Sequence, residues 1–184
     1  AATVSNGSLK GTALLVDNAG TTAPTTGGIA VKSLAQTAGK VGISGKATVS
    51  DGSLTAAVLT VDGKGDLPTT DGVALNELEQ TGGTTTTTTA SVSGGTFLLS
   101  GGTLTASTSL TASGGTLTLS GGTLTTPALT VSGGTLTLSG GTVAADATTV
   151  SKGTLSTAAL ILSSDISKPS AGLNTKAFTY SGGT

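Results

Sequence analysis

A six-residue motif that ends in two glycines and a threonine recurs along the middle of the chain, at a spacing of about 19 to 20 residues. It occurs at 91–96, 111–116, 130–135 and, with Lys152-Gly153 in place of the two glycines, at 149–154. In the first three copies a second glycine pair follows, at 101–102, 121–122 and 140–141. A repeat this short cannot bury its apolar side chains without neighbours on which to stack. We therefore expect a repeat protein whose core forms between successive units.

Between the glycine pairs, apolar and polar residues alternate. In 116–119 the sequence is Thr-Leu-Thr-Leu, so Leu117 and Leu119 point one way and the threonines the other, as in a β-strand. Equivalent residues return once per circuit of three strands, which favours a β-solenoid over a meander of hairpins. The inward columns are then Val92, Ala112, Val131, Val150; Phe97, Leu117, Leu136, Leu155; Leu99, Leu119, Leu138; and Leu104, Leu124, Val143.

A longer repeat of about 45 residues occupies the first half, where 2–9 matches 47–54, and a fainter third copy begins at Val150. Each unit is interpreted as two coils, one of which carries a protruding loop, near 18–28, 63–72 and 164–174. The only segment with helical potential is 73–80. About eight coils, at the roughly 4.8 Å spacing of neighbouring strands, predict an all-β rod about 38 Å long.

These repeats predict one β-solenoid domain over residues 1–184. It divides into loop-bearing coils in two units over 1–90, regular coils over 91–148, and a loop-bearing coil with an unfinished terminal coil over 149–184.

The composition excludes much catalytic and binding chemistry. The sequence has no His, Cys or Trp, and all eight basic residues are lysine, against nine acidic residues. A Ser-His-Asp arrangement, an imidazole base and a zinc site of the His or Cys type are therefore absent, and so is a basic groove with stacking platforms for nucleic acid. No apolar run approaches the roughly 18 residues of a membrane span. We expect a non-enzymatic protein without a cofactor.

Two segments resemble a known class of repeats. Gly115-Thr116-Leu117-Thr118-Leu119-Ser120-Gly121-Gly122, and again 134–141, are similar to the strand repeats of bacterial autotransporter passengers and related exported β-solenoid adhesins. The resemblance covers about residues 91–145. It implies a secreted, surface-displayed, right-handed β-helix with no catalysis in the repeats.

The ends of the chain suggest a homopolymer. Solenoids expose unpaired strand edges at both ends, and no capping segment is evident in the sequence. The segment 178–184 resembles 129–135, the opening of a coil, and the first residues of another copy are suited to complete it. The predicted contact residues are Ala1, Ala2, Thr3, Val4, Ser5, Phe178, Thr179, Tyr180, Ser181 and Thr184.

From Gln80 to Ala145 no residue is charged, so this surface lacks the charges that usually prevent self-association. We expect an extracellular or cell-surface fibre subunit, and the missing initiator Met suggests a mature chain after removal of a signal peptide. The alternative is a fragment of a larger surface adhesin whose flanking coils are missing.

Outward Thr-x-Thr rows give a different functional alternative. Such rows resemble the ice-binding faces of β-solenoid antifreeze proteins, although threonine is also a common outward residue of strands. The candidate ice-binding residues are Thr103, Thr105, Thr123 and Thr125 in one row, and Thr116, Thr118, Thr135 and Thr137 in another. The run 84–89 is interpreted as an exposed strand or loop, with glycosylation as an alternative.

A weak calcium site is the only metal candidate. Asp62, Asp66 and Asp71 share one glycine-rich loop, and hard oxygen ligands on a loop suit Ca²⁺. Their spacing follows neither the EF-hand nor the repeated glycine-aspartate turns, which favours ordinary turn residues.

Overall fold

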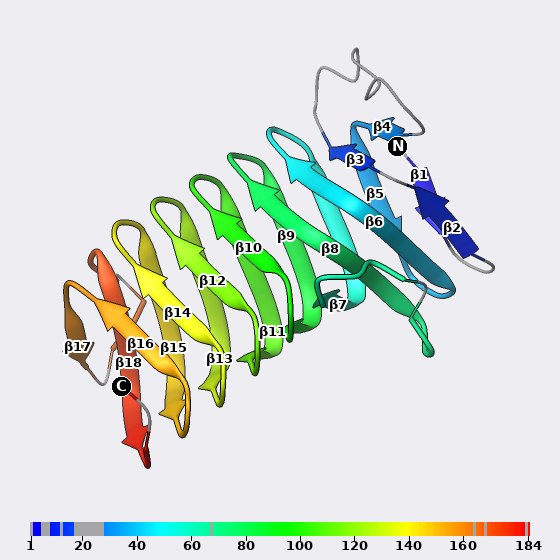
Figure 1. Cartoon of the computed structure of the whole chain (residues 1–184). Helices are drawn as coiled ribbons and strands as arrows, with labels where there is room; N and C mark the ends of the chain where they lie inside the picture. The colour runs from blue at the N-terminus through cyan, green and yellow to red at the C-terminus, as the bar shows by residue number, and fades with distance from the viewer. Residues whose placement is uncertain are drawn as a thin grey trace.

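The computed structural model is a single parallel β-sheet wound into a rod, with the two termini at opposite ends (Figure 1). It describes residues 2–4, 8–11, 13–16, 28–66, 68–163, 165–167, 169–182 and 184. The strands in the first half are β1 (Ala2–Val4), β2 (Ser8–Gly11), β3 (Ala13–Val16), β4 (Gly28–Val31), β5 (Ser33–Gln36), β6 (Lys40–Val49), β7 (Ser53–Val61), β8 (Gly72–Gln80) and β9 (Thr84–Val92). Those in the second half are β10 (Thr96–Leu99), β11 (Thr103–Ala112), β12 (Thr116–Leu119), β13 (Thr123–Val131), β14 (Thr135–Leu138), β15 (Thr142–Val150), β16 (Thr154–Thr157), β17 (Leu160–Leu162) and β18 (Gly172–Tyr180). The predicted all-β solenoid is confirmed.

The solenoid has three sides, which we call A, B and C. Each long strand bends in its middle, so that its two halves belong to two neighbouring sides. Side A stacks 2–4, 33–36, 53–56, 84–87, 103–106, 123–126, 142–145, 172–175 and 160–162, in that order. Side B stacks 8–11, 40–43, 72–75, 58–61, 89–92, 109–112, 128–131, 147–150 and 177–180. Side C stacks 28–31, 13–16, 46–49, 77–80, 96–99, 116–119, 135–138 and 154–157.

Glycine pairs form the corners on either side of side C. At the corner from side C to side A, Gly102, Gly122 and Gly141 have φ of 75°, 71° and 70°, a conformation that residues with a Cβ rarely adopt. At this corner each coil also lies against the one before, and a Cβ on Gly121 would come 2.2 Å from the Ser100 carbonyl oxygen. Close stacking of backbones therefore requires glycine at these places.

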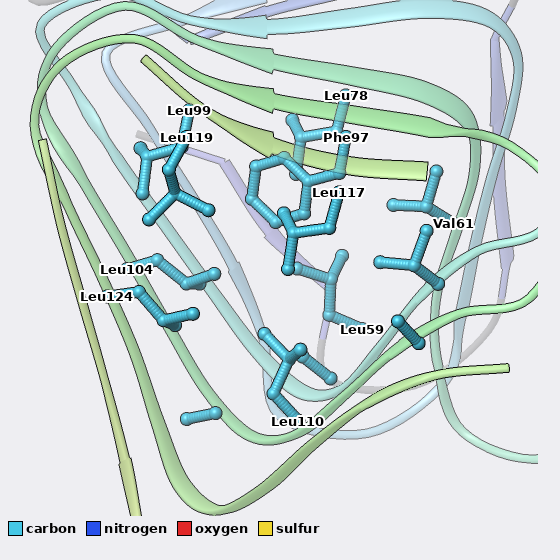
Figure 2. Packing of buried hydrophobic residues seen from close by; sticks show 14 of the residues in the cluster. Leu59, Val61, Leu78, Phe97, Leu99, Leu104, Leu110, Leu117, Leu119 and Leu124 are labelled. Atoms are coloured by element: carbon cyan, nitrogen blue, oxygen red, sulfur yellow. The ribbon is translucent and has the colours of Figure 1, made fainter. Parts of the chain in front are cut away.

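The predicted inward columns are confirmed by the strand register. Val92, Ala112, Val131 and Val150 are successive partners on side B, and Phe97, Leu117, Leu136 and Leu155 are successive partners on side C. Figure 2 shows Leu99 with Leu119, and Leu104 with Leu124, projecting into the space enclosed by the strands. Nearly all these side chains are fully buried, so a single aliphatic core runs along the rod.

Each of three loops returns the chain to the side it has just left. The strand after the loop pairs parallel with the strand before it, and lies toward the N-terminal end of the rod. This happens on side C with β4 after β3, on side B with β8 after β7, and on side A with β18 after β17. The order of strands along a side therefore differs from their order in the chain at three places.

The described loops lie against the outside of the rod rather than protruding as expected. In the loop between β7 and β8, Gly65 is buried beside the Ile43 carbonyl, and the Lys40 Nζ donates to the Thr69 carbonyl at 2.7 Å. In the loop between β17 and β18, the Ser170 carbonyl accepts from Asn174 Nδ2 at 2.6 Å. Most of the first loop, 17–27, lies outside the described residues.

The segment 73–80 is part of strand β8, so its helical potential is not realised. Val73 and Leu75 point inward on side B, and after the bend Leu78 points inward on side C. At the bend, two residues instead of one, Asn76 and Glu77, separate the inward Leu75 from the inward Leu78. Apolar residues three positions apart are also typical of a helix, which explains the helical pattern in the sequence.

Candidate functional site

The last strands of the rod expose apolar side chains at positions that belong to the core. Leu160, Leu162 and Tyr180 are 41%, 63% and 57% exposed. Their Cα partners in the preceding strands are Leu173, Thr175 and Val150, all of which are fully buried. The exposed side chains thus continue inward columns that have no further strand over them among the described residues.

Strand β17 is the part of this end that the sequence prediction missed. The sequence predicts the terminal contact at 178–184, because this last segment of the chain resembles the opening of a further coil. Instead, β18 is inserted between β15 and β17, so β17 forms the outermost strand of side A. The exposed apolar pattern Leu160-Ile161-Leu162 is the signal that could have revealed it.

The predicted contact residues of the C-terminal segment differ in their burial and in their hydrogen bonds. Phe178 is half-buried and packs against the core, whereas Thr179 is exposed on the outside of side B. The Ser181 amide donates to the Val150 carbonyl at 2.9 Å. Thr184 lies beside β16, where its amide donates to the Gly153 carbonyl and its carbonyl accepts from the Leu155 amide.

At the other end of the rod, β1 and β2 are the first strands of sides A and B. Ala2, Thr3 and Val4 pair with β5, and the Val4 carbonyl accepts from the Thr37 amide at 3.0 Å. Val4 and Leu9 are half-buried against the core. Ala1 and Ser5, also predicted contact residues, lie outside the described residues.

The predicted threonine rows are in register. On side A, Thr103 and Thr105 pair with Thr123 and Thr125, and on side C, Thr116 and Thr118 pair with Thr135 and Thr137. All of these are exposed or half-exposed.

The row on side A is longer than the sequence alone predicts, since the run 84–89 contributes to it. Thr84 and Thr86 pair with Thr103 and Thr105, and on their other side with Ser53 and Thr55. Thr85 and Thr87 of the same run are buried in the core. The run is therefore an ordered strand with one polar and one interior face.

No charged residue occurs at the outward positions of side A between Ser33 and Thr142. The outward residues there are Ser33, Ala35, Ser53, Thr55, Thr84, Thr86, Thr103, Thr105, Thr123, Thr125 and Thr142. Side C is less uniform, because Leu98, Glu77 and Glu79 occupy outward positions in line with its threonines. Side A is thus the more regular hydroxyl-bearing surface.

Lys46, Glu77 and Glu79 occupy neighbouring outward positions on side C. Lys46 Nζ forms an ion pair with Glu79 Oε2. The hydrogen bond to Glu79, together with the negative charges of Glu79 and Glu77, raises the pKa of Lys46, and partial burial opposes this rise. The arrangement is a partly exposed ion pair between neighbouring coils.

The three aspartates of the calcium candidate do not converge. Asp62 Oδ1 accepts from the amides of Lys64 and Gly65, both at 2.8 Å, so it stabilises the start of its own loop. Asp66 and Asp71 are exposed. Within the described part of the chain, no group of three or more carboxylates is placed to hold a metal ion.

Comparison of the chain with protein-family models, with curated proteins and with solved structures gives no match. None of the described segments forms a helix long and apolar enough to cross a membrane.

Proposed function

We propose that the chain is a structural subunit of an extracellular or cell-surface fibre, in which copies stack end to end. The observation that carries this proposal is the exposure of Leu160, Leu162 and Tyr180 at inward positions of the outermost strands. Elsewhere along these columns the next strand covers the equivalent side chains. A second copy that added its first strands here would bury them in the same way.

Two forces favour such a contact. Burial of a Leu side chain contributes about 1.5–3 kcal/mol. The outer edge of β17, which pairs with β18 alone among the described strands, also offers backbone groups that a parallel strand from another copy satisfies by β-augmentation. Because the N-terminal end of one copy meets the C-terminal end of the next, the contact does not close on itself and extends into a filament.

The remaining parts of the proposal rest on the sequence. The absence of His and Cys supports a structural rather than a catalytic role. The similarity of 115–122 and 134–141 to exported β-solenoid repeats supports an extracellular location.

The direct test is assembly of the purified chain, followed by negative-stain microscopy and by sedimentation at rising concentration. We expect thin, unbranched filaments. Leu162→Lys places a charge in the contact and should weaken each contact roughly 10- to 100-fold, because the apolar burial is lost. Thr86→Lys introduces the same charge on side A, away from the ends, and should assemble normally. Monomers of the unaltered chain at every concentration, or equal assembly of both variants, would contradict the proposal.

Ice binding is a second candidate, and the length of the charge-free row on side A favours it. Hydroxyl and methyl groups repeat there at the spacing of neighbouring strands, roughly 4.8 Å. Such a flat, regular surface suits ordered water. Thr105→Lys should then abolish thermal hysteresis, whereas Thr118→Lys on side C should preserve it. Absence of hysteresis in the unaltered chain would exclude this function.

A further inference from the structure

We infer that stacked copies meet in one register, in which β1 of one copy pairs with β17 of the next and β2 pairs with the second half of β18. This inference rests on the proposed end-to-end assembly and specifies its contact. On side A it places Val4 against Leu162, because these residues begin and end one inward column. On side B it places Leu9 against Phe178 and Gly11 against Tyr180 for the same reason.

Side-chain size agrees with this register. Tyr180 is the largest exposed side chain at the C-terminal end, and it meets Gly11, which has no side chain to displace. Leu9 and Phe178 are each half-buried against their own core, so the register adds a second apolar neighbour to both. A shift by one residue would instead place Leu9 or Gly11, which belong to inward columns, beside the outward Thr179.

Charge also permits this register. In the four segments that would pair, 2–4, 8–11, 160–162 and 177–180, Lys10 is the only charged residue. Lys10 is exposed on the outside of side B and would lie beside Thr179, which is exposed on the same side. The register therefore brings no like charges together.

The register concerns sides A and B alone. On side C the Leu155 amide already donates to the Thr184 carbonyl at 2.6 Å, so the edge of β16 is partly used within the chain. A two-fold contact between two C-terminal ends is the competing arrangement. It would make the strands antiparallel and would stop at a dimer.

Engineered cysteines test the register, because the chain has no native cysteine. Lys10→Cys combined with Thr179→Cys creates a matched pair, since neighbouring strand residues lie about 4.8 Å apart, within the Cα distance that a disulfide spans. Lys10→Cys combined with Ala177→Cys is the control. It also uses exposed residues, but the offset of two residues separates the Cα atoms by about 8 Å, beyond that distance.

Under mild oxidation, the matched variant should form a ladder of covalent oligomers, at least tenfold more than the control. Either single-cysteine variant should form none. A ladder in the control but not in the matched variant would overturn the register while leaving end-to-end assembly intact. Covalent dimers of Thr179→Cys alone would show the two-fold contact and overturn the register. Monomers of the unaltered chain in sedimentation would reject the proposed function as well.

Discussion

Thr85 lies in register with Leu104 in one inward column of side A, and its buried Oγ1 has no hydrogen-bond partner among the described residues. Two residues further along the same strand, Thr87 is also buried, but it donates its hydroxyl to the Thr89 carbonyl at 2.8 Å. The two residues therefore differ in whether a buried hydroxyl is satisfied.

Thr85→Val should increase the free energy of unfolding by about 1 kcal/mol, because valine has nearly the same shape and removes an unpartnered polar group. Thr87→Val is the matched control and should give no gain, since it also removes a hydrogen bond. Urea-induced unfolding of both variants measures the difference. Equal stability changes would show that the hydroxyl of Thr85 is satisfied in solution.

Gly102→Ala should destabilise the chain by about 2–4 kcal/mol. Gly102 has a φ of 75°, and a Cβ there would lie 2.5 Å from the carbonyl carbon of Gly82 in the preceding coil. Ser100→Ala changes an exposed residue of the same turn and should stay within about 0.5 kcal/mol of the unaltered chain. Thermal unfolding distinguishes the two, and a tolerated alanine at 102 would refute the close stacking of these corners.

Asn174→Ala should release the loop between β17 and β18. The buried Asn174 side chain donates to the carbonyls of Val143, Ser170 and Gly172, and its Oδ1 accepts from the Ser170 amide. Loss of these bonds should cost about 1–3 kcal/mol, because buried carbonyls lose their partner. Limited digestion with a nonspecific protease should then cut within 163–171. Thr179→Ala, at an exposed position of the same strand, should leave this loop protected.

Glu79→Gln should lower the pKa of Lys46 toward its ordinary value, because Glu79 is the main cause of its rise. A raised pKa in the folded state means that the ion pair stabilises the fold at neutral pH, and that this contribution is lost as the pH rises through the pKa of Lys46. The loss should be below about 1 kcal/mol, since the pair is partly exposed to solvent. Titration of the lysine by NMR measures the shift. Glu77→Gln should produce a smaller fall, and an equal fall would contradict the dominance of the hydrogen bond.

The columns and corners were predictable because they depend on local, repeated chemistry. Glycine pairs before each Thr-Leu-Thr-Leu segment determine where the chain turns and which residues point inward, so Leu117 and Leu136 could be paired from spacing alone. The rows of Thr103 and Thr123 follow from the same register.

The strand order at the loops was not predictable in this way. Periodicity predicts that each coil stacks on the coil that precedes it in the sequence. Strand β18 follows β17 in the sequence, but it lies between β15 and β17 on side A. The inward position of Thr85 was missed as well, because a run of identical residues carries no alternation of polarity.

The returning strands differ in their mechanical effect, because only one of them lies between strands that the rest of the rod holds in place. A single additional strand on one side lengthens that side by roughly 4.8 Å and acts as a wedge, which would curve the rod away from it. Only the segment 72–75 of β8 lies inside its stack, between 40–43 and 58–61 of side B, whereas β4 and β17 are the outermost strands of their sides and add length only at the ends of the rod. Deletion of 62–75, which would join 58–61 directly to 77–80 as in a regular coil, should therefore change the curvature of the rod, whereas deletion of 17–31 should leave it unaltered.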